Sequence, residues 1–305
     1  MQKGSFVGNI AQDLGLEAKA LSERGVRVIS RGRTQYFALN VKSGHLITAE
    51  RLDREQLCGR AEKCLLNCEV IVEHEMKMYG VEVEIRDIND NAPNFQEEEL
   101  EFQVSETTAP RSRFPLHEAH DPDLGINSLQ TYRLNNDKHF SLAVQAGSDG
   151  DKYAELVLES ALDREEQATH DLVLTATDGG DPVRSGTAHI RIIVLDANDN
   201  APVFSQPVYR VDVSENVPRD STILTVQATD LDEGVNKELK YSFRKITEKA
   251  SKVFHLDSRT GDVMVVRVLD FEEASLYEME VQAHDGGGLF DSFAFRLDSR
   301  DSFKM

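Results

Sequence analysis

Apolar and polar residues alternate with a period of two in several short segments of this chain. The alternation is clear in residues 171–177 (DLVLTAT), 189–196 (HIRIIVLD) and 277–283 (YEMEVQA). A period of two places the apolar side chains on one face of a β-strand, and residues typical of turns separate the segments. The pattern predicts an all-β fold built from β-sandwiches of about seven strands each.

One segment near the start has a different pattern. In residues 9–23 (NIAQDLGLEAKALSE), Ile10, Leu14 and Leu21 are spaced nearly as on one face of a helix. The spacing does not decide between a helix and an irregular structure. We therefore expect an extended segment that is followed by a loop or a short helix.

Five short motifs recur along the chain at intervals of 107 to 110 residues. They are LDRE at 52–55 and 162–165, echoed by LDFEE at 269–273; VSE at 104–106 and 213–215; DPDLGIN at 121–127 and DLDEGVN at 230–236; TDGG at 177–180 and HDGG at 284–287; and DINDNAP at 87–93 and DANDNAP at 196–202. A shared interval for unrelated motifs indicates that one structural unit is repeated. The sequence predicts a tandem array of three units of about 108 residues each.

Acidic residues outnumber basic ones, 54 against 34, and the formal net charge is −20. This charge repels nucleic acid and anionic lipid, and it favours cations as partners. Mutual repulsion would also destabilise the compact state unless bound ions neutralise it. No apolar run approaches the roughly 20 residues of a membrane span. The start, MQKGSFVGNI, lacks the apolar core of a signal peptide, so we expect neither a span nor a leader in this chain.

The acidic motifs lie in predicted loops and linkers, where they can converge at the junctions between units. DxNDNAP forms the linker because its proline ends the preceding strand, VSE lies on the first strand of the next unit, and LDRE and DxDxGxN occupy loops. Together they supply carboxylate, carboxamide and carbonyl oxygens, which are the ligands of Ca²⁺; Mg²⁺ prefers to keep its waters. An EF-hand is excluded, because DPDLGIN has glycine at position five and no glutamate at position twelve. The alternative is a set of solvated acidic loops, which the fixed recurrence disfavours.

The three cysteines, Cys58, Cys64 and Cys68, lie within eleven residues of one another. Cys68 shares the parity of the apolar residues in CLLNCEVIVE, so we expect a buried thiol on a strand. Cys58 and Cys64 flank the polar segment GRAEK, which a disulfide could close. A zinc site that includes His74 is an alternative, although the spacing lacks the paired short knuckles of familiar zinc sites.

The sequence does not favour an enzyme. HEAH at 117–120 has one residue too few for the HExxH motif of zinc proteases, and it lies in a predicted loop. The motifs GxSxG, GxGxxG and the Walker loop do not occur. We therefore expect no catalytic activity.

The motifs LDRE, DxNDNAP, DxDxGxN and TDGG, at this interval, resemble those of cadherin extracellular repeats. GSFVGNIAQDLGL at 4–16, with the Cys58–Cys64 spacing, is similar to the first repeat of a clustered protocadherin, most closely of the gamma group. The resemblance implies three cadherin-type Greek-key β-sandwich repeats joined end to end by calcium-binding linkers, and a Cys58–Cys64 disulfide. The expected repeats are residues 1–92, 93–201 and 202–292, and a divergent tail follows at 293–305.

The resemblance further implies about three Ca²⁺ ions at each of the two junctions. At the first junction the implied ligands are Asp53, Glu55, Asp87, Asn89, Asp90, Asp121, Asp123 and Asp178, with the backbone carbonyls of Ile88, Asn91 and Asn127. At the second junction they are Glu106, Asp163, Glu165, Asp196, Asn198, Asp199, Asp230, Asp232 and Asp285, with the carbonyls of Ala197, Asn200 and Asn236.

Two departures from the family pattern change these expectations. In the family a strand with an acidic residue precedes GSFVGN, whereas MQK stands there in this sequence, so we expect weaker binding at the first junction. The third unit ends in FAFRLDSRDSFKM without another DxNDN. We therefore expect an incomplete last strand, a truncated form of the family, and no metal at Glu215, Asp270 and Glu272.

The resemblance implies calcium-dependent homophilic adhesion at the extracellular face of the plasma membrane. An identical or closely related protocadherin on an apposed cell would pair with this chain in antiparallel fashion, and a second partner would bind in cis. In TTAPRSRFPLHEAHD at 107–121 we expect the apolar residues beside charged ones to be exposed, which makes Phe114 and Leu116, with Arg113, candidate contact residues. The alternative is that Phe114 packs within its own unit. The alternative is a truncated soluble or non-functional fragment that acts at most as a decoy.

Overall fold

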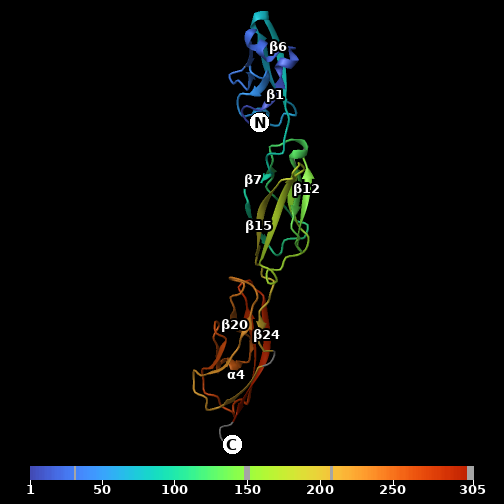
Figure 1. The fold of residues 1–305 in the computed structure, drawn as a ribbon. Coiled ribbons are helices and arrows are strands. Elements are labelled where there is room, and N and C mark those ends of the chain that lie inside the picture. Colours follow the sequence, from blue (N-terminus) through green and yellow to red (C-terminus); the bar gives the residue numbers. More distant parts are fainter. Residues whose placement is uncertain (31, 148–151, 207–208, 301–305) are drawn as a thin grey trace. The chain divides into compact units, whose positions relative to one another are not determined.

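The computed structural model describes residues 1–30, 32–147, 152–206 and 209–300, with the elements in chain order from blue to red in Figure 1. The chain forms two compact units. Unit 1 comprises residues 1–100, 113–157 and 172–190, and unit 2 comprises residues 101–112, 158–171 and 191–305. The second of the three repeats contributes residues to both units.

The first repeat contains two three-stranded sheets, with the strand orders β1-β4-β3 and β2-β5-β6. Its elements are β1 (Phe6–Asn9), α1 (Ile10–Asp13), α2 (Ala18–Glu23), β2 (Val26–Ser30), β3 (Phe37–Asn40), β4 (His45–Thr48), α3 (Arg54–Cys58), β5 (Cys64–Val72), the 3₁₀ helix η1 (Glu73–Glu75) and β6 (Lys77–Ile85). The segment with helical spacing, residues 9–23, begins at the end of β1 and forms the two short helices α1 and α2. Helix α2 is held to the core by Leu21, which is completely buried in the same hydrophobic cluster as Phe37 and Leu46.

The second repeat contains a four-stranded sheet, β11-β14-β15-β8, a three-stranded sheet, β12-β13-β9, and the pair β10-β7. Its elements are β7 (Asn94–Phe95), β8 (Glu99–Ser105), β9 (Arg113–Pro115), β10 (Ala119–His120), the 3₁₀ helix η2 (Gly125–Asn127), β11 (Leu129–Leu134), β12 (Phe140–Ala146), β13 (Lys152–Leu158), β14 (Thr169–Asp178) and β15 (Ser185–Leu195). The predicted alternation on β14 and β15 is confirmed, since Leu172, Leu174, Ile190 and Ile192 are all buried.

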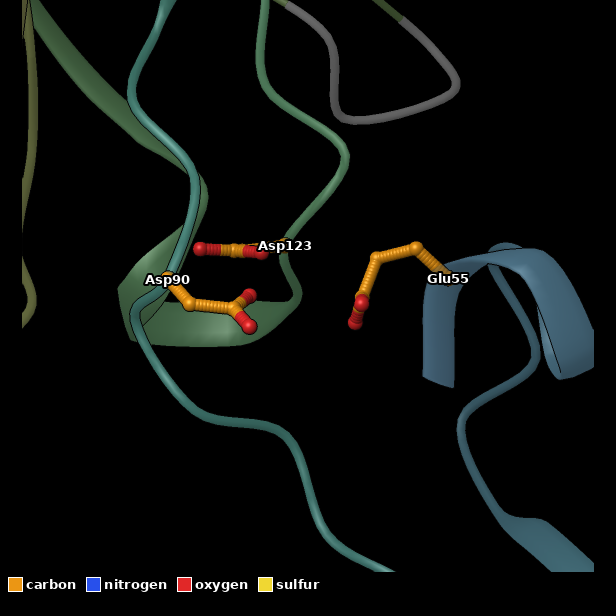
Figure 2. A group of neighbouring side chains, drawn as sticks. All are labelled: Glu55, Asp90 and Asp123. Atoms are coloured by element: carbon orange, nitrogen blue, oxygen red, sulfur yellow. The ribbon is translucent and has the colours of Figure 1, made fainter. Parts of the chain in front are cut away.

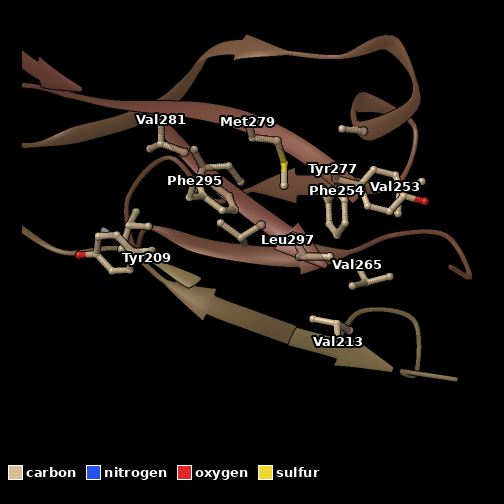
Figure 3. Packing of buried hydrophobic residues seen from close by; sticks show 14 of the residues in the cluster. Tyr209, Val213, Val253, Phe254, Val265, Tyr277, Met279, Val281, Phe295 and Leu297 are labelled. Atoms are coloured by element: carbon tan, nitrogen blue, oxygen red, sulfur yellow. The ribbon is translucent and has the colours of Figure 1, made fainter. Parts of the chain in front are cut away.

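The third repeat contains a four-stranded sheet, β17-β24-β23-β20, a three-stranded sheet, β18-β22-β21, and the pair β16-β19. Its elements are β16 (Val203–Phe204), β17 (Arg210–Ser214), β18 (Thr222–Thr225), β19 (Ala228–Thr229), β20 (Lys240–Ile246), α4 (Glu248–Ser251), β21 (Phe254–Leu256), β22 (Asp262–Val265), β23 (Leu276–His284) and β24 (Phe290–Arg300). Figure 3 shows Met279 and Val281 packing with Phe295 and Leu297 in its core.

The last strand of the third repeat is longer than the sequence motifs predicted. Strand β24 continues through the divergent segment to Arg300, pairing antiparallel with β23 and parallel with β17. The expectation of an incomplete strand is wrong because pairing depends on alternation rather than on motif identity. Phe295 and Leu297 face the core at 2% and 0% exposure, while Arg296 and Asp298 are exposed. The boundary at residue 292 stays a prediction.

Replacing Leu297 by alanine tests whether β24 belongs to the core. We expect Leu297→Ala to reduce the unfolding free energy of the third repeat by about 3 kcal/mol, because a fully buried side chain would leave a cavity. The exposed neighbour provides the control, since Asp298→Ala should change stability by about 0.5 kcal/mol or less. Urea denaturation followed by circular dichroism measures both, and equal effects would contradict the inward position of Leu297.

The structure confirms the predicted disulfide and the predicted buried thiol. Cys58 and Cys64 form a disulfide with a Cα–Cα distance of 5.5 Å, which closes the loop between α3 and β5. Cys68 is a free, buried cysteine on β5, and burial raises the pKa of its thiol. Among the described residues, the groups of side chains that could hold a metal contain neither cysteine nor histidine, so the zinc alternative finds no support.

Candidate metal centres

Three carboxylates approach one another at the first junction, within unit 1. Glu55 extends from helix α3, Asp90 from the linker, and Asp123 from the loop before η2. Figure 2 shows the three side chains directed toward a common space, and each offers an oxygen within 4.8 Å of the others. Segments that are far apart in the sequence therefore contribute oxygens to one small volume.

The LDRE motif positions its acidic residues by starting a helical turn. The Asp53 carboxylate accepts a hydrogen bond from the Gln56 backbone N–H at 3.0 Å, which caps α3 at its N-terminus. The second copy has the same local geometry, with Asp163 accepting from Glu166 at 3.0 Å. The turn then directs the glutamate two residues later, such as Glu55, toward the linker.

The first aspartate of each linker is fixed by the DxDxGxN loop of the next repeat. Asp87 Oδ2 accepts hydrogen bonds from the Leu124 N–H and from Asn127 Nδ2, each at 3.0 Å. Asp196 repeats the arrangement in unit 2, accepting from the Glu233 N–H at 3.1 Å and from Asn236 Nδ2 at 3.0 Å. The side-chain bonds from Asn127 and Asn236 explain why the motif ends in asparagine, and the backbone carbonyls of these two asparagines stay predicted ligands.

The last asparagine of each linker holds the second aspartate of DxDxGxN. Asn91 Nδ2 donates to Asp123 Oδ1 at 2.6 Å, and the Asn91 backbone N–H donates to Asp123 Oδ2 at 3.1 Å. In unit 2, Asn200 Nδ2 donates to Asp232 Oδ1 at 3.0 Å. The linker and the loop are therefore joined at both ends of the motif.

Several buried aspartates have one satisfied oxygen and one without a donor. Asp121 Oδ1 accepts from the Asp123 N–H at 3.1 Å, and Asp230 Oδ1 accepts from the Asp232 N–H at 2.9 Å. Asp178 Oδ1 accepts from the Arg184 N–H at 2.9 Å. No hydrogen bond from the described residues reaches the buried Oδ2 atoms of Asp121, Asp178, Asp230, Asp232 and Asp285.

Two linker asparagines present a similar oxygen. Asn89 Nδ2 donates to the Pro182 carbonyl at 2.6 Å, and this bond orients the amide. The buried Oδ1 atoms of Asn89 and Asn198 accept no hydrogen bond from the described residues. A buried acceptor without a partner costs free energy, and a buried carboxylate without a cation costs more. These oxygens fit a hard cation such as Ca²⁺, which binds carboxylate and carboxamide oxygens.

The second junction, within unit 2, gathers more carboxylates than the first. Three overlapping groups have oxygens within 4.8 Å, namely Glu106 with Asp163 and Glu165; Glu165 with Asp196 and Asp232; and Asp230 with Asp232 and Asp285. Glu106 is held by the backbone N–H groups of Arg164 at 2.9 Å and Ala197 at 2.6 Å. Among the described residues of the first junction there is one such group.

Burial, together with neighbouring carboxylates, raises the pKa values of several acidic residues at the junctions. Burial raises the pKa of Asp230, and the nearby carboxylates of Asp232 and Asp285 raise it further. Burial likewise raises the pKa of Asp199, and Glu106 and Asp232 add to this effect. Burial is also the main cause of the raised pKa values of Glu55, Asp121 and Glu165. Burial and, to a smaller extent, the neighbouring carboxylates disfavour the charged form of these groups, and a bound cation would favour it.

Asp196 has the opposite shift. Burial acts to raise the pKa of its carboxyl group, but hydrogen bonds from Asn236, from the Glu233 N–H and from Arg164 outweigh it and lower the pKa. The guanidinium of Arg164 lies directly against this carboxylate at 2.6 Å. The second junction thus contains a basic side chain that the sequence analysis did not assign to the site.

The structure gives hydrogen bonds for two of the backbone carbonyls predicted as ligands. The carbonyls of Ile88 and Ala197 accept short-range hydrogen bonds from Asp90 at 2.8 Å and Asp199 at 2.9 Å, and each carbonyl has a second lone pair. The carbonyls of Asn91, Asn127, Asn200 and Asn236 stay predictions. At the far end of the third repeat, the described residues Glu215, Asp270 and Glu272 belong to none of the carboxylate groups.

The glycines of TDGG and HDGG were recognised as a repeat but not as part of the site. A Cβ atom at Gly180 would lie 2.2 Å from Asn89 Nδ2, and one at Gly287 would lie 2.2 Å from Asn198 Cγ. A Cβ atom at the preceding Gly286 would lie 2.1 Å from the Val235 carbonyl oxygen. These contacts require glycine because the loop touches the linker asparagine directly. The repetition of both glycines was the available sequence signal.

The structure also describes the candidate contact residues on β9 and the HEAH motif. Leu116 is only 7% exposed and its N–H donates to the Ala154 carbonyl at 3.0 Å, so the expectation of an exposed contact residue is wrong: it packs in its own repeat. Arg113 is exposed and pairs with Glu155 at 2.7 Å, and Phe114 is half-buried on β9. His120 of HEAH lies on strand β10 rather than on a helix.

The described residues contain no helix with the length and apolar character needed to cross a membrane.

The profile of the family described as Cadherin-like matches residues 1–74, and that of the Cadherin domain matches residues 100–195 and 209–292. Protocadherin gamma-A7 of Homo sapiens is 60% identical over 286 residues, which are 94% of this chain and 31% of that protein. The chain thus spans about a third of the length of such relatives.

Solved structures give the same result. The structure of mouse clustered PcdhgC3 EC1-3 has a TM-score of 0.89 and 44% identity, and the match covers 99% of this chain and 98% of that one. Protocadherin Gamma C5 EC1-3 has a TM-score of 0.87 and 46% identity, over 98% and 97% of the two chains. The chain therefore belongs to the cadherin family, as the region of the first three extracellular repeats of a clustered gamma protocadherin.

Proposed function

We propose that this chain binds about three Ca²⁺ ions at each of its two junctions, and that the ions stiffen it for homophilic cell–cell recognition. The observation that supports the metal most strongly is the set of buried aspartate oxygens that accept no hydrogen bond among the described residues. When bound, Ca²⁺ would supply the positive charge that these oxygens lack. The residues of this chain hold the oxygens in place through backbone N–H groups and linker asparagines.

The net charge gives a second argument for this stoichiometry. Six divalent ions would offset about twelve of the 20 net negative charges, which would relieve most of the self-repulsion of the chain. The residues proposed to hold the ions are the ligand sets named above for each junction. The second junction is expected to bind more tightly, because it gathers three carboxylate groups and the first gathers one.

We place the recognition activity outside the cell. An identical or closely related protocadherin on an apposed cell is the proposed partner in an antiparallel pair, with a second contact in cis. Family membership supports this assignment, and an adhesive rather than catalytic role follows from the same membership. A decoy or misfolded fragment is less well supported, because strand β24 completes the third repeat with full pairing.

Sedimentation of residues 1–305 tests the recognition activity. We expect weak self-association in millimolar Ca²⁺ and none in chelator, since rigid junctions present several repeats together. Beads coated with the chain should aggregate weakly or not at all in Ca²⁺, because family pairing also uses a fourth repeat that these residues do not contain. Association that is unchanged by chelation would contradict the proposal, and strong bead aggregation would contradict the need for a fourth repeat.

A further inference from the structure

The two LDRE motifs contain equivalent arginines with different surroundings. Arg54 and Arg164 follow the aspartate of the motif in each copy, and both are buried, at 5% and 9% exposure. Each lies beside the glutamate of the motif and near the first aspartate of the linker. The chain therefore contains two versions of one local structure, and the partners of the two guanidinium groups can be compared directly.

Arg164 binds three separate segments of the second junction. Its Nε donates to Asp196 Oδ1 in the linker at 2.6 Å. Its remaining nitrogens contact Glu233 at 2.8 Å and the Leu231 carbonyl at 2.8 Å, both in the DxDxGxN loop of the third repeat, and also the neighbouring Glu165 carboxylate. One guanidinium thus connects the LDRE turn, the linker and the next repeat.

Arg54 is directed elsewhere in the first junction. Its nitrogens donate to the carbonyls of Gly59 at 3.2 Å and Ala61 at 2.5 Å, inside the loop that the Cys58–Cys64 disulfide closes. Arg54 forms only long ion pairs with the acidic residues of the junction, at 3.7 Å to Asp87 and 4.0 Å to Glu55, and Asp87 Oδ1 accepts no hydrogen bond from the described residues. No cysteine follows the second LDRE motif, so no disulfide loop lies between this motif and β14.

We propose that Arg164 is an internal counter-cation that competes with Ca²⁺ for the second junction, and that hydrogen bonds to the disulfide loop keep Arg54 from hydrogen-bonding the carboxylates of the first. This inference rests on the proposed calcium binding. Asp196 and Glu165 are both proposed ligands, and a carboxylate oxygen bonded to a guanidinium is less available to a metal. Arginine does not lose its proton at any relevant pH, so only displacement can free these oxygens.

The consequence is a difference between the junctions at low Ca²⁺. The second junction keeps a charge-assisted connection between repeats when calcium is scarce, and it gives up part of its metal affinity in exchange. Arg54 connects the LDRE turn of the first junction to the linker only through the long ion pair with Asp87, so the order of this junction depends more completely on the metal. The arginine of the LDRE motif therefore connects repeats at the second junction, whereas at the first it holds the disulfide loop.

Calcium titration of Arg164→Gln by calorimetry tests the proposal. The titration is made in an Asp90→Ala background, which weakens the first junction so that the second is observed. We expect the second junction to bind Ca²⁺ roughly tenfold more tightly, because a charge-assisted competitor is removed. In chelator the same variant should melt at a lower temperature than its parent. Arg191→Gln is the matched control, since this arginine is exposed and its nearest carboxylate, Asp171, is 3.6 Å away; it should change neither quantity.

A second variant changes a partner of Arg164 that is not a proposed ligand. Glu233 is exposed and pairs with Arg164, so Glu233→Gln should leave the guanidinium more fully to Asp196 and Glu165 and weaken Ca²⁺ binding at the second junction. For the first junction, Cys58→Ser with Cys64→Ser in an Asp199→Ala background should weaken Ca²⁺ binding, because Arg54 is released from the loop carbonyls and can hydrogen-bond Asp87. Unchanged binding in these serine variants would overturn the role of the loop.

The outcomes separate this inference from the proposed function. If the parent chain binds no Ca²⁺, the proposed function itself fails. If the parent binds and Arg164→Gln binds equally well, only the competition is overturned. Weaker binding by Arg164→Gln would show that the arginine supports the loaded site, which also contradicts the proposal.

Discussion

Removal of Ca²⁺ with a chelator should lower the melting temperature of this chain, and Asp199→Ala should abolish most of the contribution of the second junction. Extracellular calcium modules bind with dissociation constants of about 10⁻⁴ to 10⁻³ M. At 1 mM Ca²⁺ each such site then stabilises the folded chain by about 0.4–1.4 kcal/mol, and several sites together should produce a large shift.

Asp199 is the informative position because of its neighbours. Burial raises the pKa of Asp199, and repulsion by the carboxylates of Glu106, Asp232, Asp163 and Asp196 raises it further. Without Ca²⁺, Asp199→Ala removes a repelled charge, and its metal-free stability should equal or exceed that of the parent. With Ca²⁺, the variant should gain much less than the parent.

The control for this prediction is a carboxylate of the same unit outside the site. Asp171 has 73% of its side chain exposed, so Asp171→Ala should retain the full calcium-dependent shift. Thermal melts with millimolar Ca²⁺ and with chelator measure all three proteins. If Asp199→Ala melts like the parent under both conditions, the assignment of ligands at the second junction is wrong.

Gly287→Ala should weaken Ca²⁺ binding at the second junction by at least roughly tenfold, while the metal-free protein keeps most of its stability. The new Cβ atom would lie 2.2 Å from Asn198 Cγ, so the amide of Asn198 has to move. A short polar side chain can turn away at little cost to folding. It then no longer holds its oxygen where the proposed ion requires it.

Gly286→Ala should have the opposite balance. Its Cβ atom would lie 2.1 Å from the Val235 carbonyl, which is backbone and cannot rotate away. We expect a loss of about 1–3 kcal/mol of folding stability, as is usual for overpacking. Gly80→Ala is the control for both, because a Cβ atom there meets nothing within 4 Å. Calorimetric titration and urea denaturation separate the two effects, and equal behaviour of Gly287→Ala and Gly80→Ala would contradict the contact with Asn198.

Much of the fold could be predicted because each piece of information is local. Alternation with a period of two identified strands such as β14 and β23, and the recurring motifs gave the number of repeats. The types of ligand were also predictable, because a linker of aspartates and asparagines offers only oxygen donors of the kind that Ca²⁺ binds. The disulfide between Cys58 and Cys64 agreed with the polar loop between them.

The errors arose where a motif was given more weight than the pattern around it. Strand β24 was expected to be incomplete because its residues differ from the family, but Phe295 and Leu297 retain the alternation that sheet pairing needs. Leu116 was expected to be exposed because charged residues surround it in the sequence. Its burial depends on a strand neighbour, Ala154, that lies 38 residues away.

The sequence by itself determined the repeating unit, the sandwich fold and the oxygen ligands, because spacing and residue type are properties of the chain alone. Only the tertiary structure decided which oxygens of Asp121 or Asp232 lack a donor, why Gly287 has no room for a side chain, and where the two arginines point. Satisfaction of a hydrogen bond and contact between atoms depend on segments far apart in sequence, and their positions are fixed only when the chain has folded.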